Sequence, residues 1–194
     1  MKVLLTNGSP HKEGCTYTAL CEVSEALNEN GIDTDLFWIG KKPLSGCIAC
    51  YSCSKNNKCV FDDTVNEFLD IAGDYDGFVF GSPVHYASAA GNMASFMDRL
   101  AYAGGKYLAY KPAAICCSAR RAGTTSTLDQ LVKYPQFFHM PLVNGSYWAM
   151  VHGSNPEQVL QDAEGCAVMQ ELGRNMAWLL RCIEAGKAAG IQHP

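Results

Sequence analysis

Short apolar runs alternate with amphipathic segments along the whole chain. The apolar runs predict buried strands, and the segments between them space apolar residues three and four apart, as one face of a helix requires. We expect strands at residues 3–7, 34–39, 78–80, 113–117 and within 142–151. We expect helices at residues 16–30, 63–72, 89–100, 128–138 and 162–184.

The order of these elements indicates the fold class. Strand and helix alternate five times, which predicts a parallel sheet covered by helices on both faces. Five such units in 194 residues fit the flavodoxin-like strand order 2-1-3-4-5 better than a full dinucleotide-binding domain. The chain has no internal repeat, low-complexity stretch or linker. Residues 1–194 are therefore predicted to form one doubly wound α/β domain, with a cysteine-rich loop at 44–63.

Composition and charge narrow the possible partners. Apolar residues make up 48% of the chain, charged residues 18%, and the net charge is −4. The longest basic runs are Lys41-Lys42 and Arg120-Arg121, so we expect no nucleic-acid partner, which would need a basic stripe. No apolar run is long enough for a signal peptide or a spanning helix, so we expect a cytoplasmic protein without a membrane partner. In a reducing compartment, the ten cysteines are expected to be free thiols, metal ligands or redox groups.

The loop after the first strand has the character of a phosphate site. In a doubly wound sheet, ligands bind outside the carboxyl ends of the strands. This loop is rich in hydroxyl groups and leads into a helix N-terminus, which favours an anion. Ser9, Thr16 and Thr18 are candidate phosphate donors, with His11 or Lys12 supplying charge. The GxxxxGK[ST] and GxGxxG patterns are absent, so the loop suits a single phosphate monoester, as in FMN. A plain turn with Thr16 as the helix N-cap is the alternative.

The loops after the third and fourth strands are predicted to converge with the first one. In the loop after the third strand, Pro83 fixes the backbone φ angle and removes a backbone N–H donor. The rings of His85 and Tyr86, which follow, can flank a flat heterocycle. In the loop after the fourth strand, Gly123 allows close backbone approach, and Arg120 suits a pyrimidine-like edge or a nicotinamide phosphate. The candidate cofactor-binding residues of the two loops are Pro83, Val84, His85, Tyr86, Ser118, Arg120 and Gly123.

Four cysteines lie close together in the cysteine-rich loop, at Cys47, Cys50, Cys53 and Cys59. Thiolates at such short spacings suit a [4Fe–4S] cluster. Zinc sites usually pair two CxxC motifs across a longer gap, which makes zinc the less favoured metal. A loop without metal, holding reduced thiols or an incidental disulfide, is the remaining alternative. Most other cysteines are expected in the core, except Cys15, whose place at a helix N-terminus predicts a lowered pKa.

These motifs resemble the NADPH-dependent FMN reductase family, and most closely its iron–sulfur flavoprotein branch. The resemblance spans residues 1–125 and is carried by Gly8-Ser9-Pro10 with Gly14 and Thr16, Gly46-Cys47 with Cys50, Cys59-Val60-Phe61-Asp62-Asp63, Gly81-Ser82-Pro83-Val84 and Phe96-Met97-Asp98-Arg99. It implies a flavodoxin-like fold, non-covalent FMN, reduction by a nicotinamide or a ferredoxin-type donor, and a homodimer or homotetramer.

The resemblance also implies roles for single residues. The phosphate binders correspond to Ser9, His11, Thr16 and Thr18. The segment along the isoalloxazine ring corresponds to Pro83 to Tyr86, and the third flavin loop to Ser118, Arg120 and Gly123. The cluster ligands correspond to Cys47, Cys50, Cys53 and Cys59. The chain departs from the family in having His11 where Arg is usual, Cys15 where Asn is usual, and His85 where Tyr is common. Because His11 is only partly charged at neutral pH, phosphate binding is expected to depend more on hydroxyl and backbone groups.

We therefore expect an FMN-dependent oxidoreductase that passes electrons between NAD(P)H or a reduced carrier and an acceptor, with or without a [4Fe–4S] cluster. The redox chemistry belongs to the cofactor, so no acid–base pair or nucleophilic triad is expected. One alternative is an electron-carrier flavoprotein without a substrate of its own. Another is a redox-sensing or zinc-binding module of flavodoxin-like fold.

Overall fold

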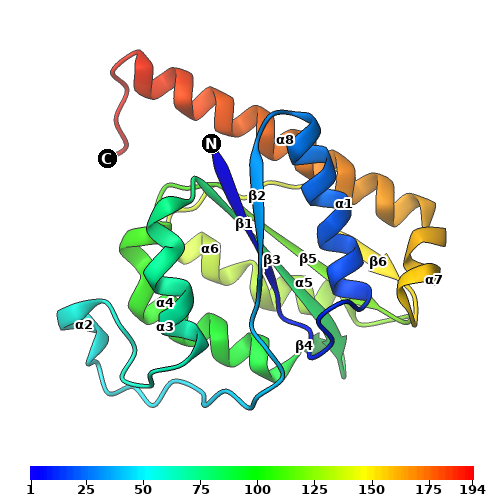
Figure 1. Ribbon diagram of the computed structural model, residues 1–194, viewed down its shortest axis with the longest axis horizontal. Helices are drawn as coiled ribbons and strands as arrows, with labels where there is room; N and C mark the ends of the chain where they lie inside the picture. Colours follow the sequence, from blue (N-terminus) through cyan, green and yellow to red (C-terminus); the bar gives the residue numbers. More distant parts are fainter.

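A parallel sheet between two layers of helices forms the protein, in a computed structural model that describes residues 1–194 (Figure 1). The strands are β1 (Lys2–Asn7), β2 (Asp33–Trp38), β3 (Gly77–His85), β4 (Ser88–Ala89), β5 (Ala113–Ala119) and β6 (Met150–His152). They stand in the order β2-β1-β3-β5-β6, and the short β4 pairs antiparallel with β3. Without β4, the parallel strands follow the order 2-1-3-4-5, so the predicted flavodoxin-like arrangement is confirmed.

Helices cover both faces of the sheet. They are α1 (Cys15–Glu29), α2 (Cys53–Asn56), α3 (Thr64–Ile71), α4 (Gly91–Leu108), α5 (Thr124–Leu131), α6 (Lys133–Phe137), α7 (Pro156–Gln161) and α8 (Ala163–Ala188), with a 3₁₀ turn η1 (Ala72–Asp74). One hydrophobic cluster joins the sheet to α1, α7 and α8, and a second joins it to α3, α4 and α5. Figure 1 shows α1 and α8 on one side of the strands and α3 and α4 on the other.

The central strand β1 shows why the sheet is buried on both sides. Its successive side chains point to opposite faces, because the strand has a period of two. Val3 and Leu5 belong to the cluster under α1 and α8, while Leu4 belongs to the cluster under α3 and α4. A strand that is buried on both faces appears in the sequence as a continuous apolar run, and such a run predicted β1.

Local signals place the ends of several elements. α1 ends where Gly31 takes a φ of +71°, the left-handed conformation that favours glycine, as its position predicts. α3 begins after Asp63, whose carboxylate accepts the backbone N–H of Val65 at 3.1 Å and so caps the helix.

Five elements differ from their predicted extents. β3 continues beyond residue 80 to His85, because Gly81 to Pro83 still pair with β5 and the next two residues pair with β4. α4 continues past Leu100, since Ala103 and Leu108 extend its buried face. The predicted helix 128–138 begins earlier and is split into α5 and α6. The predicted helix 162–184 corresponds to α8, which continues to Ala188, and the short α7 before it was not predicted. Within 142–151, where one strand was predicted, a single bridge at Leu142 and the start of β6 join the sheet, and β6 ends at His152.

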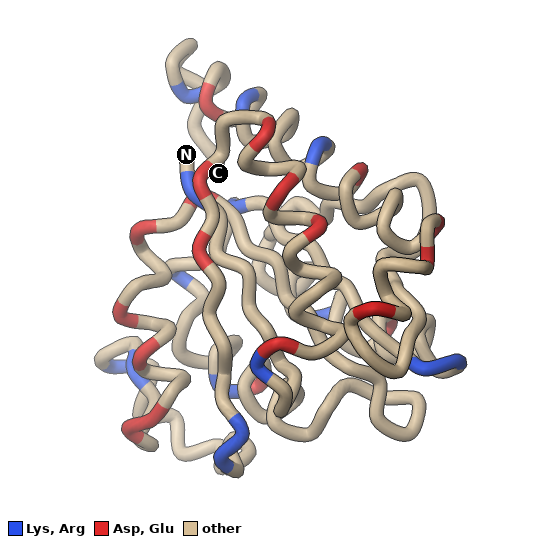
Figure 2. Tube along the Cα trace, turned by 45° about the vertical axis from the view of Figure 1, so that its right-hand side comes forward, with Lys and Arg blue, Asp and Glu red and all other residues tan.

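Charged residues are dispersed over the molecule. Figure 2 shows Lys and Arg interspersed with Asp and Glu along the trace, without a continuous basic stripe in view. None of the helices combines the length and the apolar character that a membrane-spanning segment needs.

The close contact between α1 and α8 depends on Gly173, which has no side chain. A Cβ at Gly173 would lie 2.7 Å from the carbonyl oxygen of Val23 and 2.8 Å from the Cβ of Ala26, so the helices touch there through backbone. Gly173→Ala should lower the free energy of unfolding by about 1–3 kcal/mol, because the overpacked helices must separate. Chemical denaturation measures this change.

Gly186→Ala on the same helix is the matched control, because its added Cβ would meet nothing closer than 3.9 Å. There the better helix propensity of alanine should raise the free energy of unfolding by about 0.5–1 kcal/mol. Equal stabilisation by both substitutions would show that the helices do not pack as closely as described.

Candidate functional site

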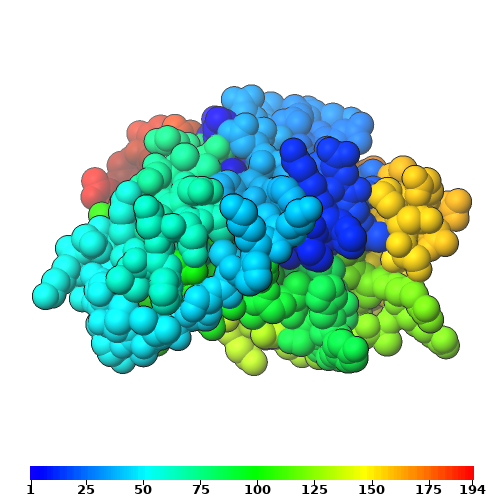
Figure 3. Space-filling model, turned by 60° about the horizontal axis from the view of Figure 1, so that its bottom comes forward, coloured from blue at the N-terminus to red at the C-terminus, as the bar shows by residue number.

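The carboxyl ends of the parallel strands bring the predicted loops to one edge of the sheet. Asn7, the last residue of β1, pairs with Trp38 of β2 and with Gly81 of β3. Pro83 of β3 pairs in turn with Ser118 of β5. The loops that follow these strands therefore start side by side. Figure 3 shows the segments they form, dark blue, cyan and green, next to one another on one face.

The first loop is closed around the side chain of Asn7. Its amide nitrogen donates to the carbonyl oxygen of Lys12 at 3.0 Å, and its amide oxygen accepts the backbone N–H of Ser9 at 2.9 Å. Trp38 donates its indole N–H to the carbonyl oxygen of Ser9 at 2.8 Å. The hydroxyl oxygen of Ser9 accepts the N–H of His11 at 3.1 Å. Asn7 and Trp38 thus fix the loop, although neither was a predicted site residue.

The loop ends at an uncapped helix N-terminus. Gly14 precedes α1 and offers no side chain, so the backbone N–H groups of Cys15, Thr16 and Tyr17 have no acceptor. These donors and the helix dipole make a site for an anion. A side chain at Gly14 would crowd His11, because its Cβ would lie 3.0 Å from the Cβ of His11. The side chain of His11 is exposed beside this N-terminus.

Two of the predicted phosphate donors point inward. The hydroxyl of Thr16 is buried and lies 2.8 Å from the hydroxyl of Ser118, in a bond that joins the first loop to β5. The hydroxyl of Thr18 donates to the carbonyl oxygen of Gly14 at 3.3 Å. His11 is exposed at the open side of the loop, whereas Ser9, Thr16 and Thr18 are buried.

The second loop is a tight hairpin between β3 and β4. Pro83, Val84 and His85 are the last residues of β3, so this segment is strand rather than loop. Tyr86 and Ala87 form the turn with φ values of +50° and +60°. Such values suit glycine or asparagine, and they cost of order 1–3 kcal/mol at other residues. The turn leaves the Tyr86 side chain fully exposed.

The third loop is packed against this hairpin. Gly123 has a φ of +89°, and a Cβ there would lie 2.6 Å from the Cα of Ala87. Ser126 of α5 donates its hydroxyl to the carbonyl oxygen of Ala87 at 2.8 Å. The amide oxygen of Gln130 accepts the N–H of Ala89 at 2.9 Å. Arg120, which precedes Gly123, is exposed. The contacts of Gln130 and Ser126 join residues about forty apart, and sequence reasoning did not find them.

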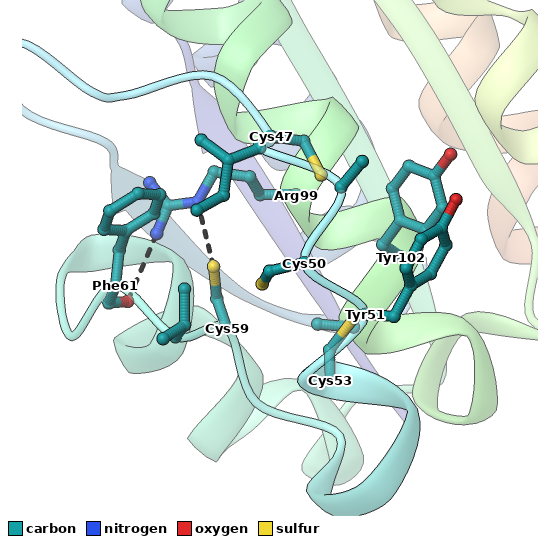
Figure 4. A pocket seen from close by; sticks show the side chains of 12 residues that line it. Cys47, Cys50, Tyr51, Cys53, Cys59, Phe61, Arg99 and Tyr102 are labelled. Carbon is teal, nitrogen blue, oxygen red and sulfur yellow. Dashed lines mark hydrogen bonds between the residues drawn. The ribbon is translucent and has the colours of Figure 1, made fainter.

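The cysteine-rich segment leaves the same edge after β2 and folds over α3 and α4. Cys47 and Cys50 are exposed, and Cys53 and Cys59 are half-buried. All four line one hollow together with apolar side chains and Arg99, and Figure 4 shows their sulfur atoms around it. No three His, Cys, Asp or Glu side chains are arranged to hold a single metal ion.

Amide side chains from two helices hold the two arms of this segment. Asn92 of α4 accepts the N–H of Leu44 at 3.2 Å and donates to the carbonyl oxygen of Lys42 at 2.8 Å. Asn66 of α3 is buried, accepts the N–H of Cys59 at 2.8 Å and donates to its carbonyl oxygen at 3.0 Å. Neither asparagine was a predicted site residue, although a buried asparagine inside a helix is itself a signal of a polar partner.

Arg99 of α4 lies completely buried under the Cys59 arm. It forms a two-pronged ion pair with Asp63, at 2.7 and 2.8 Å. Burial acts to lower its pKa, but the bonds to Asp63 and Cys59 outweigh this effect, so the pKa is raised and the guanidinium stays charged. The thiols respond to their own surroundings: burial raises the pKa of Cys53, and hydrogen bonds at Ser52 lower the pKa of Cys50.

Two expectations about the other cysteines were wrong. Burial raises the pKa of the Cys15 thiol, which donates to the carbonyl oxygen of Gly153, so the helix N-terminus does not lower it. Cys182 is exposed on the outer side of α8 rather than in the core. Cys116 is buried as expected, and burial raises its pKa to about 12.

Comparison with known proteins agrees with this geometry. An iron–sulfur flavoprotein of Methanocaldococcus jannaschii is 29% identical over 192 residues, which cover 95% of this chain and 100% of that protein. A structure of RosB with bound 8-demethyl-8-formylriboflavin-5′-phosphate has a TM-score of 0.74 at 13% identity, over 98% of this chain and 86% of that one. A flavodoxin from the domain Archaea has a TM-score of 0.61 at 14% identity, over 93% and 99% of the two chains. The family model "NADPH-dependent FMN reductase" matches residues 1–155. The chain thus belongs to the NADPH-dependent FMN reductase family.

Proposed function

We propose that this protein is an FMN-dependent oxidoreductase that passes electrons between NAD(P)H or a ferredoxin-type carrier and an acceptor. The observation that carries the proposal is the free N-terminus of α1 beside the hairpin and the third loop, at one edge of the sheet. The family of the chain supports it. The bound FMN would supply the hydride and electron chemistry, while the protein binds and orients it.

The donors at this edge fit a flavin phosphate. The backbone N–H groups of Cys15, Thr16 and Tyr17 would bind the phosphate, with the exposed His11 at its open side and the buried Ser9 hydroxyl beneath it in the loop. Thr16 and Thr18 would keep the loop in shape through their bonds to Ser118 and Gly14, rather than donate to the phosphate themselves.

The strained hairpin and the third loop would hold the ring system. Pro83, Val84, His85 and Tyr86 would lie along the isoalloxazine, and Ser118, Arg120 and Gly123 would complete its site. Flat aromatic and backbone surfaces exclude water from one face of such a ring. The exposed cation of Arg120 suits a carbonyl edge of the flavin or a phosphate of the nicotinamide.

We further propose that Cys47, Cys50, Cys53 and Cys59 bind a [4Fe–4S] cluster. The donor set is the one such clusters use, and the four thiols line a common hollow. A zinc ion would need the sulfurs about 2.3 Å from one point. No set of three ligands has that arrangement. The name of the Methanocaldococcus jannaschii relative supports the same choice.

The proposal includes assembly into a homodimer or homotetramer. Large apolar side chains remain exposed on the single chain, among them Tyr86 of the hairpin, Trp148 and Trp178. Exposed aromatic groups of this size are typical of interaction surfaces. A subunit contact at the hairpin would cover the side of the flavin that the single chain leaves open.

Absorption spectroscopy under anaerobic conditions tests the main proposal. Protein reconstituted with FMN, iron and sulfide should show the two visible flavin bands after desalting, with about four iron and four sulfide per chain. NADPH should then bleach the flavin bands. Bleaching by reduced ferredoxin alone would instead indicate an electron carrier without its own substrate. Protein that stays colourless would contradict both functions.

Replacement of one cysteine separates the two cofactors. Cys53→Ser should lose most of the bound iron, because one of four ligands is gone, while its FMN content stays unchanged. Cys182→Ser removes an exposed thiol on α8, away from the hollow, and should keep both cofactors. Iron and flavin assays give the result, and equal iron in both variants would refute the ligand assignment.

A substitution in the third loop tests the flavin site. Gly123→Ala should raise the dissociation constant of FMN about tenfold or more, since a loss of about 1.4 kcal/mol has this effect and the new Cβ displaces the hairpin. Gly40→Ala is the control, because Gly40 also has a positive φ of +84° but no atom within 4 Å of the added Cβ. Fluorescence titration of FMN measures both. An equal change in the two variants would mean that the hairpin contact has no role in binding.

A further inference from the structure

We propose that Arg99 positions Cys59 and stabilises negative charge on its sulfur, and thereby raises the reduction potential of the four-cysteine centre. The inference rests on the cluster in the proposed function and adds a residue that regulates it. Arg99 would not be a ligand. It would act on the centre through Cys59.

The guanidinium of Arg99 uses all its donors. Its Nε donates to the sulfur of Cys59 at 3.2 Å. Its two terminal nitrogens each donate to one carboxylate oxygen of Asp63, and they also donate to the carbonyl oxygens of Ser45, at 3.3 Å, and Phe61, at 3.2 Å. Arginine has five N–H donors in a rigid fork, so this set leaves none free and the Nε–H direction is fixed.

An ion pair that served stability alone would not need the bond to sulfur. The pair with Asp63 is complete through the two terminal nitrogens, which form the two-pronged contact. The Nε–H points instead into the hollow, where Arg99 is the single charged residue in the lining. No Lys, Arg or His side chain donates to Cys47, Cys50 or Cys53. Cys59 therefore differs from the other three thiols in having a cationic donor.

Burial gives this contact its strength. The side chain of Arg99 has no exposed surface, and the ring of Phe61 lies 5.0 Å from the guanidinium carbon (Figure 4). Charges interact more strongly where water is excluded. When a one-electron reductant delivers an electron to a thiolate-ligated cluster, the negative charge on the centre rises, and hydrogen bonds to its sulfurs favour the reduced form. Arg99 would supply such a bond together with a full positive charge.

Asp63 provides a matched opposite change. Its carboxylate partly neutralises the guanidinium, so Asp63→Asn should leave the positive charge of Arg99 less compensated. Asparagine also retains the N-cap of α3, because its side-chain oxygen can accept from Val65 as the aspartate does. Arg99→Gln removes the positive charge and keeps an amide donor of shorter reach. The two substitutions thus alter the same contact in opposite electrostatic directions.

The experiment compares anaerobically reconstituted protein with both variants, each holding FMN and cluster. Dithionite titration, followed by the EPR signal of the reduced cluster, gives the midpoint potential. Arg99→Gln should lower the equilibrium constant for one-electron reduction about tenfold, or about 59 mV, and Asp63→Asn should raise it. Arg99→Lys, which retains charge without the fork, should fall between the wild-type protein and Arg99→Gln.

If Arg99 only supports the structure, the variants should hold less cluster, and the cluster that remains should have the midpoint potential of the wild-type protein. That outcome overturns the inference. If Arg99→Gln does not hold a cluster, Asp63→Asn decides, since an unchanged or lower midpoint refutes the inference and a higher one supports it. If the wild-type protein takes up FMN but no iron, the cluster proposal fails and this inference fails with it. If the wild-type cluster forms and the midpoints coincide, only the role of Arg99 is refuted.

Discussion

Parallel pairing on both sides of β1 is the constraint on which the rest of the structure depends. Because β2 and β3 both run with β1, these three strands end at the same edge, and Asn7 lies between Trp38 and Gly81. The chain segments that leave the sheet at this edge are therefore packed closely against one another. The backbone N–H of Gly8 meets the carbonyl oxygen of Gly81 at 2.8 Å, and a Cβ on Gly8 would lie 2.8 Å from the same oxygen. The site is thus a result of crowded strand ends.

Most of the fold could be predicted from the sequence, because its signals are local. Apolar runs and helical periodicity located the strands and most helices, and Gly31 ended α1 as expected. The errors occurred where tertiary pairing overrides local pattern. Gly81 and Pro83 are typical of strand ends, yet β5 holds them in the sheet and β4 extends the strand to His85.

The candidate site was predictable in its loops but not in its supports. Hydroxyls, glycines and cysteines have a chemistry that can be recognised along the chain. The supports are amide side chains, which have no distinctive pattern along the sequence. Their hydrogen bonds reach other segments of the chain, as those of Asn66, Asn92 and Gln130 do. The inward bonds of Thr16 and Thr18 were missed for a similar reason, since a hydroxyl near an expected anion site can serve the protein as well as a ligand.

α4 has a further consequence as a spacer of fixed length. Met93, in the first turn of α4, lies against Gly8 of the first loop. A Cβ on Gly8 would be 2.6 Å from the sulfur of Met93. Arg99, on the same helix, holds the Cys59 arm. At 1.5 Å per residue, these two contacts are about 9 Å apart along the helix axis. The separation between the first loop and the cysteine hollow is therefore set by a rigid rod, and it does not vary with the conformation of the long segment that joins them in sequence.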